Sequence, residues 1–243
     1  MAVSVDTVYQ TVLALANKEQ RGYITPQEFN LFANLAQREI FEQYFYDLAN
    51  SELRDSNKTI STDVTDLINQ KLDLFYRTAG PNQTSNYNTA GNAFILPDDV
   101  YRVKRVEAFN VQAEYHKPTE YSSRVSSGPL TRPSPLSPAY TLRTRNAAGN
   151  MRMLVNIGNP TFNGVGIHFY RTPQEPQWGY FVVGGKALHD PNPNKTTHFE
   201  LHESEQPELV FKILKQAGLS MKHQDILQAG QGMETLEKQN EKQ

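Results

Sequence analysis

Apolar residues recur at helical spacing through the first 80 residues of the chain. Residues 6–18 place most of their apolar side chains on one side of a helix. Residues 29–48 carry a wide aromatic and apolar stripe at the same spacing. A third stripe runs through residues 62–76 and is followed by Gly80 and Pro81, which are typical of a helix end. The pattern predicts a small helical bundle in residues 1–80.

The clearest local signal marks the start of the second helix. Thr25, Pro26 and Glu28 occupy the N-cap, N1 and N3 positions of a capping box. Ile24 and Phe29 flank this box at the positions of a hydrophobic staple. Because both signals agree, we expect a helix to begin at Pro26.

From residue 94 the pattern changes to the period of two that β-strands show. Alternation or short apolar runs occur in residues 94–97, 101–106, 151–157, 165–170, 180–183 and 197–201. Residues 158–164 are rich in Gly and Asn, so they predict a hairpin between the third and fourth of these strands. We therefore expect an antiparallel β-sheet or sandwich over residues 90–202.

Two further segments complete the predicted α+β fold. Residues 122–138 are rich in Ser and Pro, and a loop of this length either has a function, such as an arm that reaches a neighbouring subunit, or is disordered. The chain becomes helical again near Ser204, so residues 203–243 are expected to form a C-terminal helical extension. The predicted organisation is thus a bundle over 1–80, a β domain over 90–202 with a long Pro/Ser-rich loop, and this extension.

The last part of the extension is polar and rich in Gln, Glu and Lys. Its apolar residues are too sparse to hold it against a core, so we expect it to bind a partner. The candidate partner-binding residues are Met221, Ile226, Leu227, Met233 and Leu236.

Charge is segregated along the chain although the net charge is only -2. Residues 1–99 carry 7 basic and 13 acidic side chains, whereas residues 100–171 carry 10 basic and 3 acidic ones. A basic segment of this kind can contact nucleic acid phosphates or the acidic segment of another copy. The candidate residues for such a contact are Arg102, Lys104, Arg105, Arg143, Arg145 and Arg152.

Composition and motifs limit the possible chemistry. The chain has no Cys, which excludes disulfides, thiolate metal sites and Cys nucleophiles. It also lacks the sequence motifs of serine hydrolases and of phosphate-binding loops, and nothing in it predicts a cofactor. His198, Glu200 and His202 alternate, so on a strand they would share a face and are the candidate metal ligands of an alternative, enzymatic function. A nucleic-acid-binding module built on the basic strands is a second alternative.

No secretory signal or membrane-spanning segment is expected. The first ten residues contain Asp6 and lack a basic region followed by a long apolar run. No stretch of the sequence approaches the length required to cross a bilayer. The sequence therefore predicts a protein that is made in the cytosol and has no membrane partner.

The order of these segments resembles that of neck proteins of tailed bacteriophages. The resemblance rests on RGYITPQEFNLFANLAQREIFEQYF, FILPDDVYRVKRVEAF, the Pro-rich insertion, PAYTLR, VGIHFYRTPQEPQWGY and HFELHESEQPELVFKILKQAGLSMKHQDILQ. These motifs cover most of the chain and are similar to ring or head-tail adaptor proteins of crAss-like and marine phages. They are architectural rather than catalytic.

The resemblance implies a non-enzymatic virion protein that forms a ring, of twelve copies, below the portal. Its partners would be copies of itself, the portal protein and other neck or tail proteins. Genomic DNA would pass through the ring without specific binding. By analogy with such adaptors, residues 220–243 would dock on the portal. Such a protein would assemble in the cytoplasm of the host bacterium.

Overall fold

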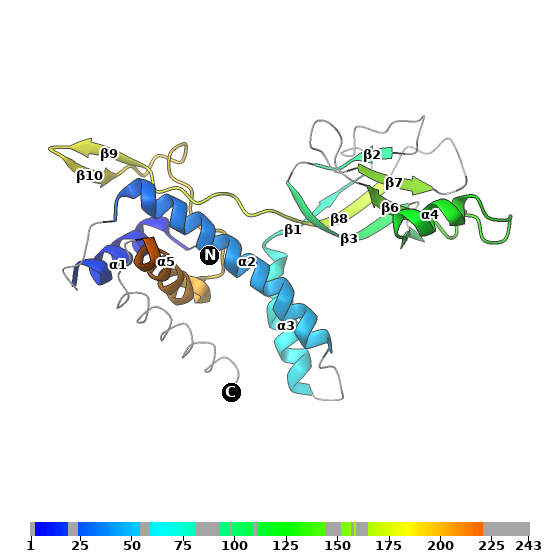
Figure 1. Ribbon diagram of the computed structural model, residues 1–243, viewed down its shortest axis with the longest axis horizontal. Coiled ribbons are helices and arrows are strands. Elements are labelled where there is room, and N and C mark those ends of the chain that lie inside the picture. Colours follow the sequence, from blue (N-terminus) through cyan, green and yellow to red (C-terminus); the bar gives the residue numbers. More distant parts are fainter. Residues whose placement is uncertain are drawn as a thin grey trace. The chain divides into compact units, whose positions relative to one another are not determined.

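The computed structural model describes residues 3–18, 24–53, 59–80, 93–97, 99–108, 111–143, 152–156, 158 and 165–220. Its described residues confirm the α+β class, with N-terminal helices, sheets in the middle and a C-terminal helix (Figure 1). They divide into two compact units. The helical unit takes its described residues from Met1–Leu74 and Pro173–Gln243, and the β unit spans Phe75–Thr172.

The helical unit contains four α-helices among its described residues. These are α1 (Val5–Lys18), α2 (Pro26–Leu53), α3 (Thr59–Asp73) and α5 (Gln206–Ser220), with the short helix η1 (Glu203–Glu205) immediately before α5. Helix α2 contacts both α3 and α5, and α1 contacts α5. The predicted bundle therefore forms, but the helix near the C-terminus is part of it. Residues 206–218 belong to this core instead of a separate extension, because apolar side chains such as Leu209 and Ile213 are fully buried.

The start of α2 confirms the predicted capping box. The Glu28 N–H donates to Thr25 Oγ1 at 3.3 Å, and the Thr25 N–H donates to Glu28 Oε2 at 3.0 Å. Ile24 and Phe29 are both buried, as expected for the hydrophobic staple. The helix begins at Pro26, the residue that the sequence predicts.

The chain that returns from the β unit packs on the helices, so the predicted boundary at residue 202 differs from the observed one. Residues 173–202 lie in the helical unit. Strands β9 (Tyr180–Val183) and β10 (Lys186–His189) pair with each other and form a separate hairpin. Residues 197–201 form isolated bridges, Thr197 with Gln177 and Phe199 with Val3, in place of the predicted strand of the central sheet.

The β unit is a sandwich of two four-stranded sheets. The first has the order β1 (Tyr76–Ala79), β8 (Val165–Arg171), β3 (Val100–Ala108), β4 (Val111–Gln112). The second has the order β2 (Ala93–Ile95), β7 (Arg152–Asn156), β6 (Ala139–Arg143), β5 (Glu114–Tyr115). All pairs are antiparallel except β5 with β6. Side chains from both sheets, including Val106, Ile167, Phe94 and Met153, form one buried core between them.

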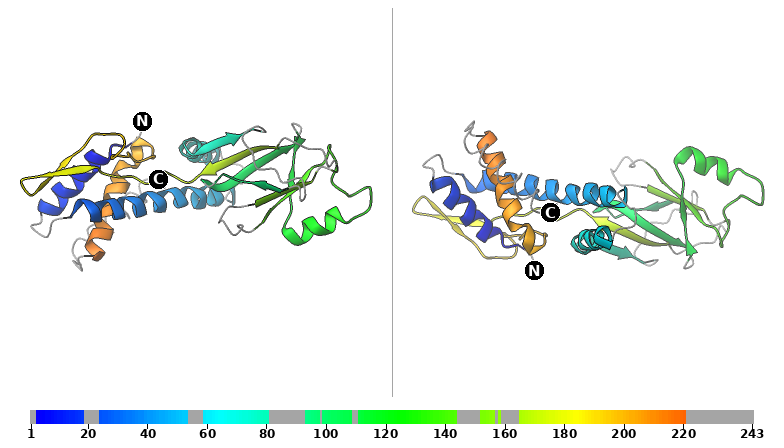
Figure 2. Two further views of the ribbon diagram at one scale, coloured as in Figure 1. Left: turned by 90° about the horizontal axis from the view of Figure 1, so that it is seen from above. Right: turned by 90° about the horizontal axis from the view of Figure 1, so that it is seen from below.

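The hairpin predicted between residues 151–157 and 165–170 is wrong. Strand β7 pairs with β2 and β6, whereas β8 pairs with β1 and β3 in the other sheet. Figures 1 and 2 show the two strands in different layers of the sandwich. The alternation is real in both strands, because each presents one apolar face to the shared core. Alternation does not identify the partner of a strand, and here the connection crosses from one sheet to the other.

The Ser/Pro-rich segment 122–138 is described in full and begins inside a helix. Helix α4 spans Pro118–Val125, and residues 126–138 form turns closed by a bridge between Ser134 and Ser137. The Arg124 guanidinium contacts Glu114 and donates to Ser137 Oγ at 3.0 Å. The hydrogen bond from Arg124 lowers the pKa of the Glu114 carboxyl below its ordinary value of 4.5. Leu130 and Leu136 are almost fully exposed, so the segment presents apolar side chains to solvent.

Among the helices that the structure describes, none combines the length and apolar character required to cross a membrane.

Two substitutions, Thr25→Ala and Glu28→Gln, test the two hydrogen-bonding side chains of the capping box. Thr25→Ala removes the hydroxyl that accepts from the Glu28 N–H, and we expect it to lower the free energy of unfolding by about 1 kcal/mol. Hydrogen bonds from the Thr25 N–H and hydroxyl lower the pKa of Glu28 from 4.5. The ionised carboxylate therefore stabilises the fold above pH 4.5, and this stabilisation is lost as the pH falls through the lower native pKa.

Urea unfolding followed by fluorescence of Trp178, the single tryptophan, measures both effects in the helical unit. The small advantage of the wild type over Glu28→Gln should be present near neutral pH and absent below the native pKa. A difference between these two chains that does not change with pH would contradict this account.

The buried indole of Trp178 provides a second test. Its Nε1–H donates to Asp6 Oδ1 at 2.9 Å. Asp6→Ala leaves this donor without its acceptor, so we expect a loss of about 1–3 kcal/mol in unfolding free energy. Asp6→Asn keeps an acceptor oxygen and is the matched control for the charge at the start of α1. If both variants are equally destabilised in the same urea experiment, the hydrogen bond is not the cause.

Candidate functional site

Five of the six basic residues singled out from the sequence lie on strands of the two sheets. Arg102, Lys104 and Arg105 lie on β3, and their side chains are exposed. Arg143 on β6 is the register partner of Arg152 on β7, in the other sheet. The side chains of these two residues, and all of Arg145, lie outside the described residues. Register shifts in the β3–β8 pairing after Val100 and Val103 bring the β3 cations to the surface.

Lys104 lies over two tyrosine rings of its own sheet. Its Nζ is 5.5 Å from the ring centroid of Tyr76 and 5.4 Å from that of Tyr170. These tyrosines are register partners on β1 and β8. An ammonium at this distance is attracted by the negative face of an aromatic ring. The ammonium group of Lys104 is therefore held against aromatic rings of its own sheet.

A polar cluster beside Lys104 was not predicted from the sequence. The Tyr76 hydroxyl is 2.7 Å from His168 Nδ1, and the Thr78 hydroxyl is 3.2 Å from the same nitrogen. His168 Nε2 is 3.6 Å from Glu107, whose carboxylate also pairs with Arg105 at 2.9 Å. A proton on Nε2 satisfies all of these contacts, with Nδ1 accepting from both hydroxyls. Alternation along residues 167–169 indicates that His168 points away from the core. The sequence does not show that β1 pairs with β8, which brings Tyr76 and Thr78 to His168.

The three candidate metal ligands make separate contacts. His198 Nδ1 accepts from the Val5 N–H at 3.3 Å, and Glu200 Oε2 accepts from the Gln174 N–H at 2.8 Å. His202 Nδ1 accepts from the Ser204 N–H at 3.2 Å and caps η1. Within the described ranges, His, Asp and Glu residues form no group of three that could hold a metal ion. The predicted shared face fails because residues 198–202 are not part of a regular strand.

The predicted partner-binding residues of the tail, from Met221 to Leu236, lie outside the described residues. Helix α5 ends at Ser220.

The β9–β10 hairpin lies at the edge of the helical unit (Figures 1 and 2). Its large apolar side chains are Phe181, Val182, Val183 and Leu188, which are 44%, 65%, 57% and 46% exposed. The two strands are joined by Gly184 and Gly185, which have φ angles of 57° and 78°. Such a pair of left-handed residues is what a two-residue hairpin turn requires.

The base of this hairpin is anchored to the helices by Trp178. The indole lies 4.1 Å from the ring of Tyr9 on α1, measured between centroids, and stacks with Tyr180 and His189 at the start and end of the hairpin. The Trp178 N–H donates to Asn30 Oδ1 on α2 at 2.8 Å. The hairpin is therefore fixed at one end and exposed at the other.

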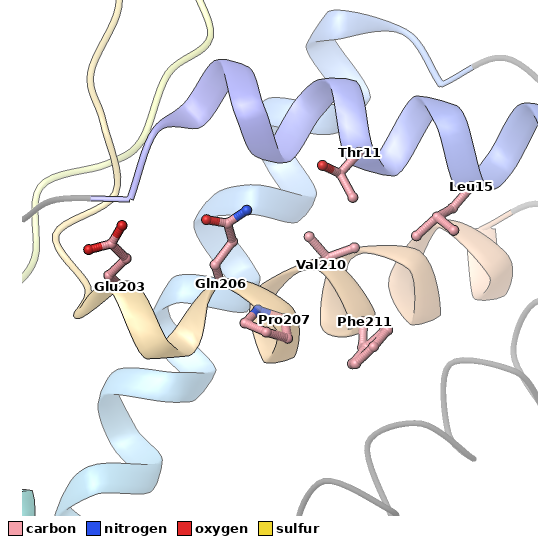
Figure 3. Close-up of a pocket in the computed structure, with 7 residues that line it drawn as sticks. All are labelled: Thr11, Leu15, Glu203, Gln206, Pro207, Val210 and Phe211. Carbon is pink, nitrogen blue, oxygen red and sulfur yellow. The ribbon is translucent and has the colours of Figure 1, made fainter.

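A shallow groove of about 450 Å³ runs between α1 and α5. Thr11 and Leu15 extend from α1 toward α5, and Val210 extends from α5 toward α1 (Figure 3). Pro207 and Phe211 lie lower on α5, and Glu203 lies at one end of the groove (Figure 3). We call this feature, whose lining is mainly apolar, the α1–α5 groove. Sequence periodicity did not predict it, because α5 was not expected to pack on α1.

The cation–π contact of Lys104 can be tested by substitution. Lys104→Met keeps the aliphatic stem and removes the charge, so we expect it to lower the unfolding free energy of the β unit by about 0.5–2 kcal/mol. Lys104→Arg keeps a cation over both rings and should remain close to the wild type. Urea unfolding followed by far-ultraviolet circular dichroism measures both variants. A Lys104→Met protein as stable as the wild type would show that the charge contributes nothing.

Comparison with known proteins identifies no relative, since no family model and no curated protein matches the sequence.

Proposed function

We propose that the protein is a non-enzymatic structural protein of a tailed-bacteriophage virion. In this role it forms an oligomeric ring in the neck, between the portal and the tail, and surrounds the channel through which the genome passes. It would be assembled in the cytoplasm of the host and remain in the neck of the virion. The proposal joins the resemblance in segment order to the surfaces that the described residues present.

The observation that carries the proposal is the exposed apolar hairpin. Apolar side chains scattered singly over a surface are ordinary, but Phe181, Val182, Val183 and Leu188 are clustered on eight paired residues. A two-stranded hairpin is only marginally stable in water by itself, and this one pairs with no other strand among the described residues. An element of this kind is typical of proteins that function by joining other subunits.

The distribution of charge also supports assembly from copies of one chain. The basic segment, residues 100–171, lies wholly in the β unit, and most of the acidic segment, residues 1–99, lies in the helical unit. Contacts between unlike units of neighbouring copies would then be attractive. The exposed Leu130 and Leu136 of the segment after α4 suit the predicted arm toward a neighbouring subunit.

The two alternative functions receive less support. A metal-dependent enzyme built on His198, Glu200 and His202 would require side chains that converge, and each of these makes its own separate contact. For nucleic acid binding, Lys104 is held over Tyr76 and Tyr170, and Arg105 pairs with Glu107. These cations are therefore less available to phosphates than their exposure suggests.

Electron microscopy tests the proposal directly. Negatively stained full-length protein should form closed rings of one diameter, with twelve copies expected, and the rings should bind end-on to the portal protein encoded by the same genome. A chain that ends at Ser220 should retain its folded helical unit, because the described core of that unit ends within α5, but should lose portal binding. Particles without closed rings would overturn the ring proposal, and normal portal binding by the shortened chain would overturn the role of residues 221–243.

A further inference from the structure

We propose that the β9–β10 hairpin of one copy packs into the α1–α5 groove of a second copy. This inference rests on the proposed ring function and deepens it, because it names the two surfaces that join neighbouring copies. Four properties of the described residues carry it: an uncovered apolar face on the hairpin, an open apolar groove, matching dimensions and two opposite charges without partners.

Three of the four side chains on one face of the hairpin are apolar. Phe181 is the register partner of Leu188, and Val183 is the partner of Lys186. Since side chains alternate between the faces of a strand, these four residues share one face. The other face begins with Tyr180 and His189, which stack on Trp178. Only the base of this second face packs on the helical unit, since Val182 on the same face is 65% exposed. The face that carries Phe181 is not covered by the residues that the structure describes.

The α1–α5 groove offers a surface of the same character. Val210 is buried and forms its floor, whereas Leu15 is 37% exposed and Pro207 is exposed along its edge. Phe211, half-buried, continues the apolar wall along α5 (Figure 3). Burial of these side chains by an apolar partner would remove both surfaces from water, at about 25 cal/mol for each Å² of apolar area.

The spacing of the two surfaces agrees. From Phe181 to Val183 the hairpin advances two residues, or about 7 Å along the strand. From Pro207 to Phe211 helix α5 advances four residues, or about 6 Å along its axis. These lengths are similar, so Phe181 and Val183 can both lie along the apolar wall of α5.

The charges at the two surfaces are opposite and unpaired. Lys186 follows the Gly184–Gly185 turn at the tip of the hairpin, and Glu203 lies at the end of the groove that precedes α5. Neither side chain has an ion-pair or hydrogen-bond partner among the described residues. The nearby acidic residues differ, because Glu205 pairs with Lys71 and Glu208 pairs with Lys212. Lys186 of one copy placed beside Glu203 of the next satisfies both.

The geometry of this contact permits an assembly with more than two copies. The hairpin and the groove are different surfaces, so each copy offers one of each and the contact is heterologous. Repetition of such a contact closes into a ring when the rotation between copies divides a full turn. The inference therefore supplies a physical basis for the proposed ring.

A charge exchange between the two surfaces tests the contact. Self-association of the full-length chain is measured by sedimentation velocity up to about 100 µM for the wild type, Lys186→Glu, Glu203→Lys and the double variant. Each single variant should raise the Kd at least tenfold, because like charges then face each other. The double variant restores an opposite pair and should return the Kd to within about threefold of the wild type. Phe181→Ser should weaken association by a similar factor without changing the charge.

Matched controls distinguish loss of this contact from a nonspecific effect of changing the net charge. Arg132→Glu and Glu42→Lys make the same charge changes at exposed positions of the β unit and of α2, and should leave the Kd unchanged. Circular dichroism melting verifies that every variant is folded. If the controls weaken association as much as the test variants, or if the double variant fails to recover, the pairing of Lys186 with Glu203 is overturned.

Four further outcomes test the contact and the proposed ring separately. A wild type that stays monomeric overturns the inference. So does a chain ending at Ser220 that associates where the full-length chain does not, since residues 221–243 would then be the occupant of the groove. If the wild type and all three charge variants form the same rings in the electron microscope, the proposed function is supported and this contact is refuted. Charge-dependent association into open assemblies would sustain the contact and refute the ring.

Discussion

The burial of Trp178 against the N-terminal helices determines where the chain goes after it leaves the β unit. Its backbone and its indole bind two helices at once, through Asn30 on α2 and Asp6 on α1. Four residues earlier, the backbone carbonyl of Gln174 accepts from the buried side chain of Gln37 at 2.7 Å. The same Gln37 side chain accepts from the Glu200 N–H at 3.1 Å, so it holds both the start and the end of the return segment. The hairpin and α5 reach their positions because these contacts bring residues 173–202 onto the helices.

The local signals of the sequence located the helices well. The capping box at Thr25 and Glu28 is the observed one, because it depends only on residues within one turn of helix. The domain boundaries could not be predicted in the same way. The contacts that assign residues 173–202 to the helical unit join positions more than 130 residues apart, such as Gln37 with Gln174 and Asn30 with Trp178. No periodicity within a segment reports on such a pairing.

The candidate residues show the same division between local and long-range information. The sequence correctly marked β3 as a strand that carries cations, but the exposure of both Lys104 and Arg105 depends on the irregular pairing of β3 with β8. What those cations contact depends on which strands lie beside β3. Tyr76 comes from β1 and Tyr170 from β8, and only the sheet order brings their rings beneath Lys104. For His198, Glu200 and His202 the error had another source, since alternation was taken as evidence of a strand that does not form.

The anchored base of the hairpin bears on how it can bind. Asp190, immediately after β10, pairs with Lys195 and accepts from the Asn192 N–H, and these contacts lower the pKa of its carboxyl below 3.8. The Thr196 hydroxyl donates to the Asp190 carbonyl and accepts from the Gly179 N–H. A Cβ at Gly179 would lie 2.7 Å from the Lys195 carbonyl oxygen, so this close packing requires glycine. The segments on both sides of the hairpin are thus ordered when the helical unit folds. Much of the entropy cost of ordering a binding element is then met in folding rather than in association, which lets a small apolar surface bind a partner usefully.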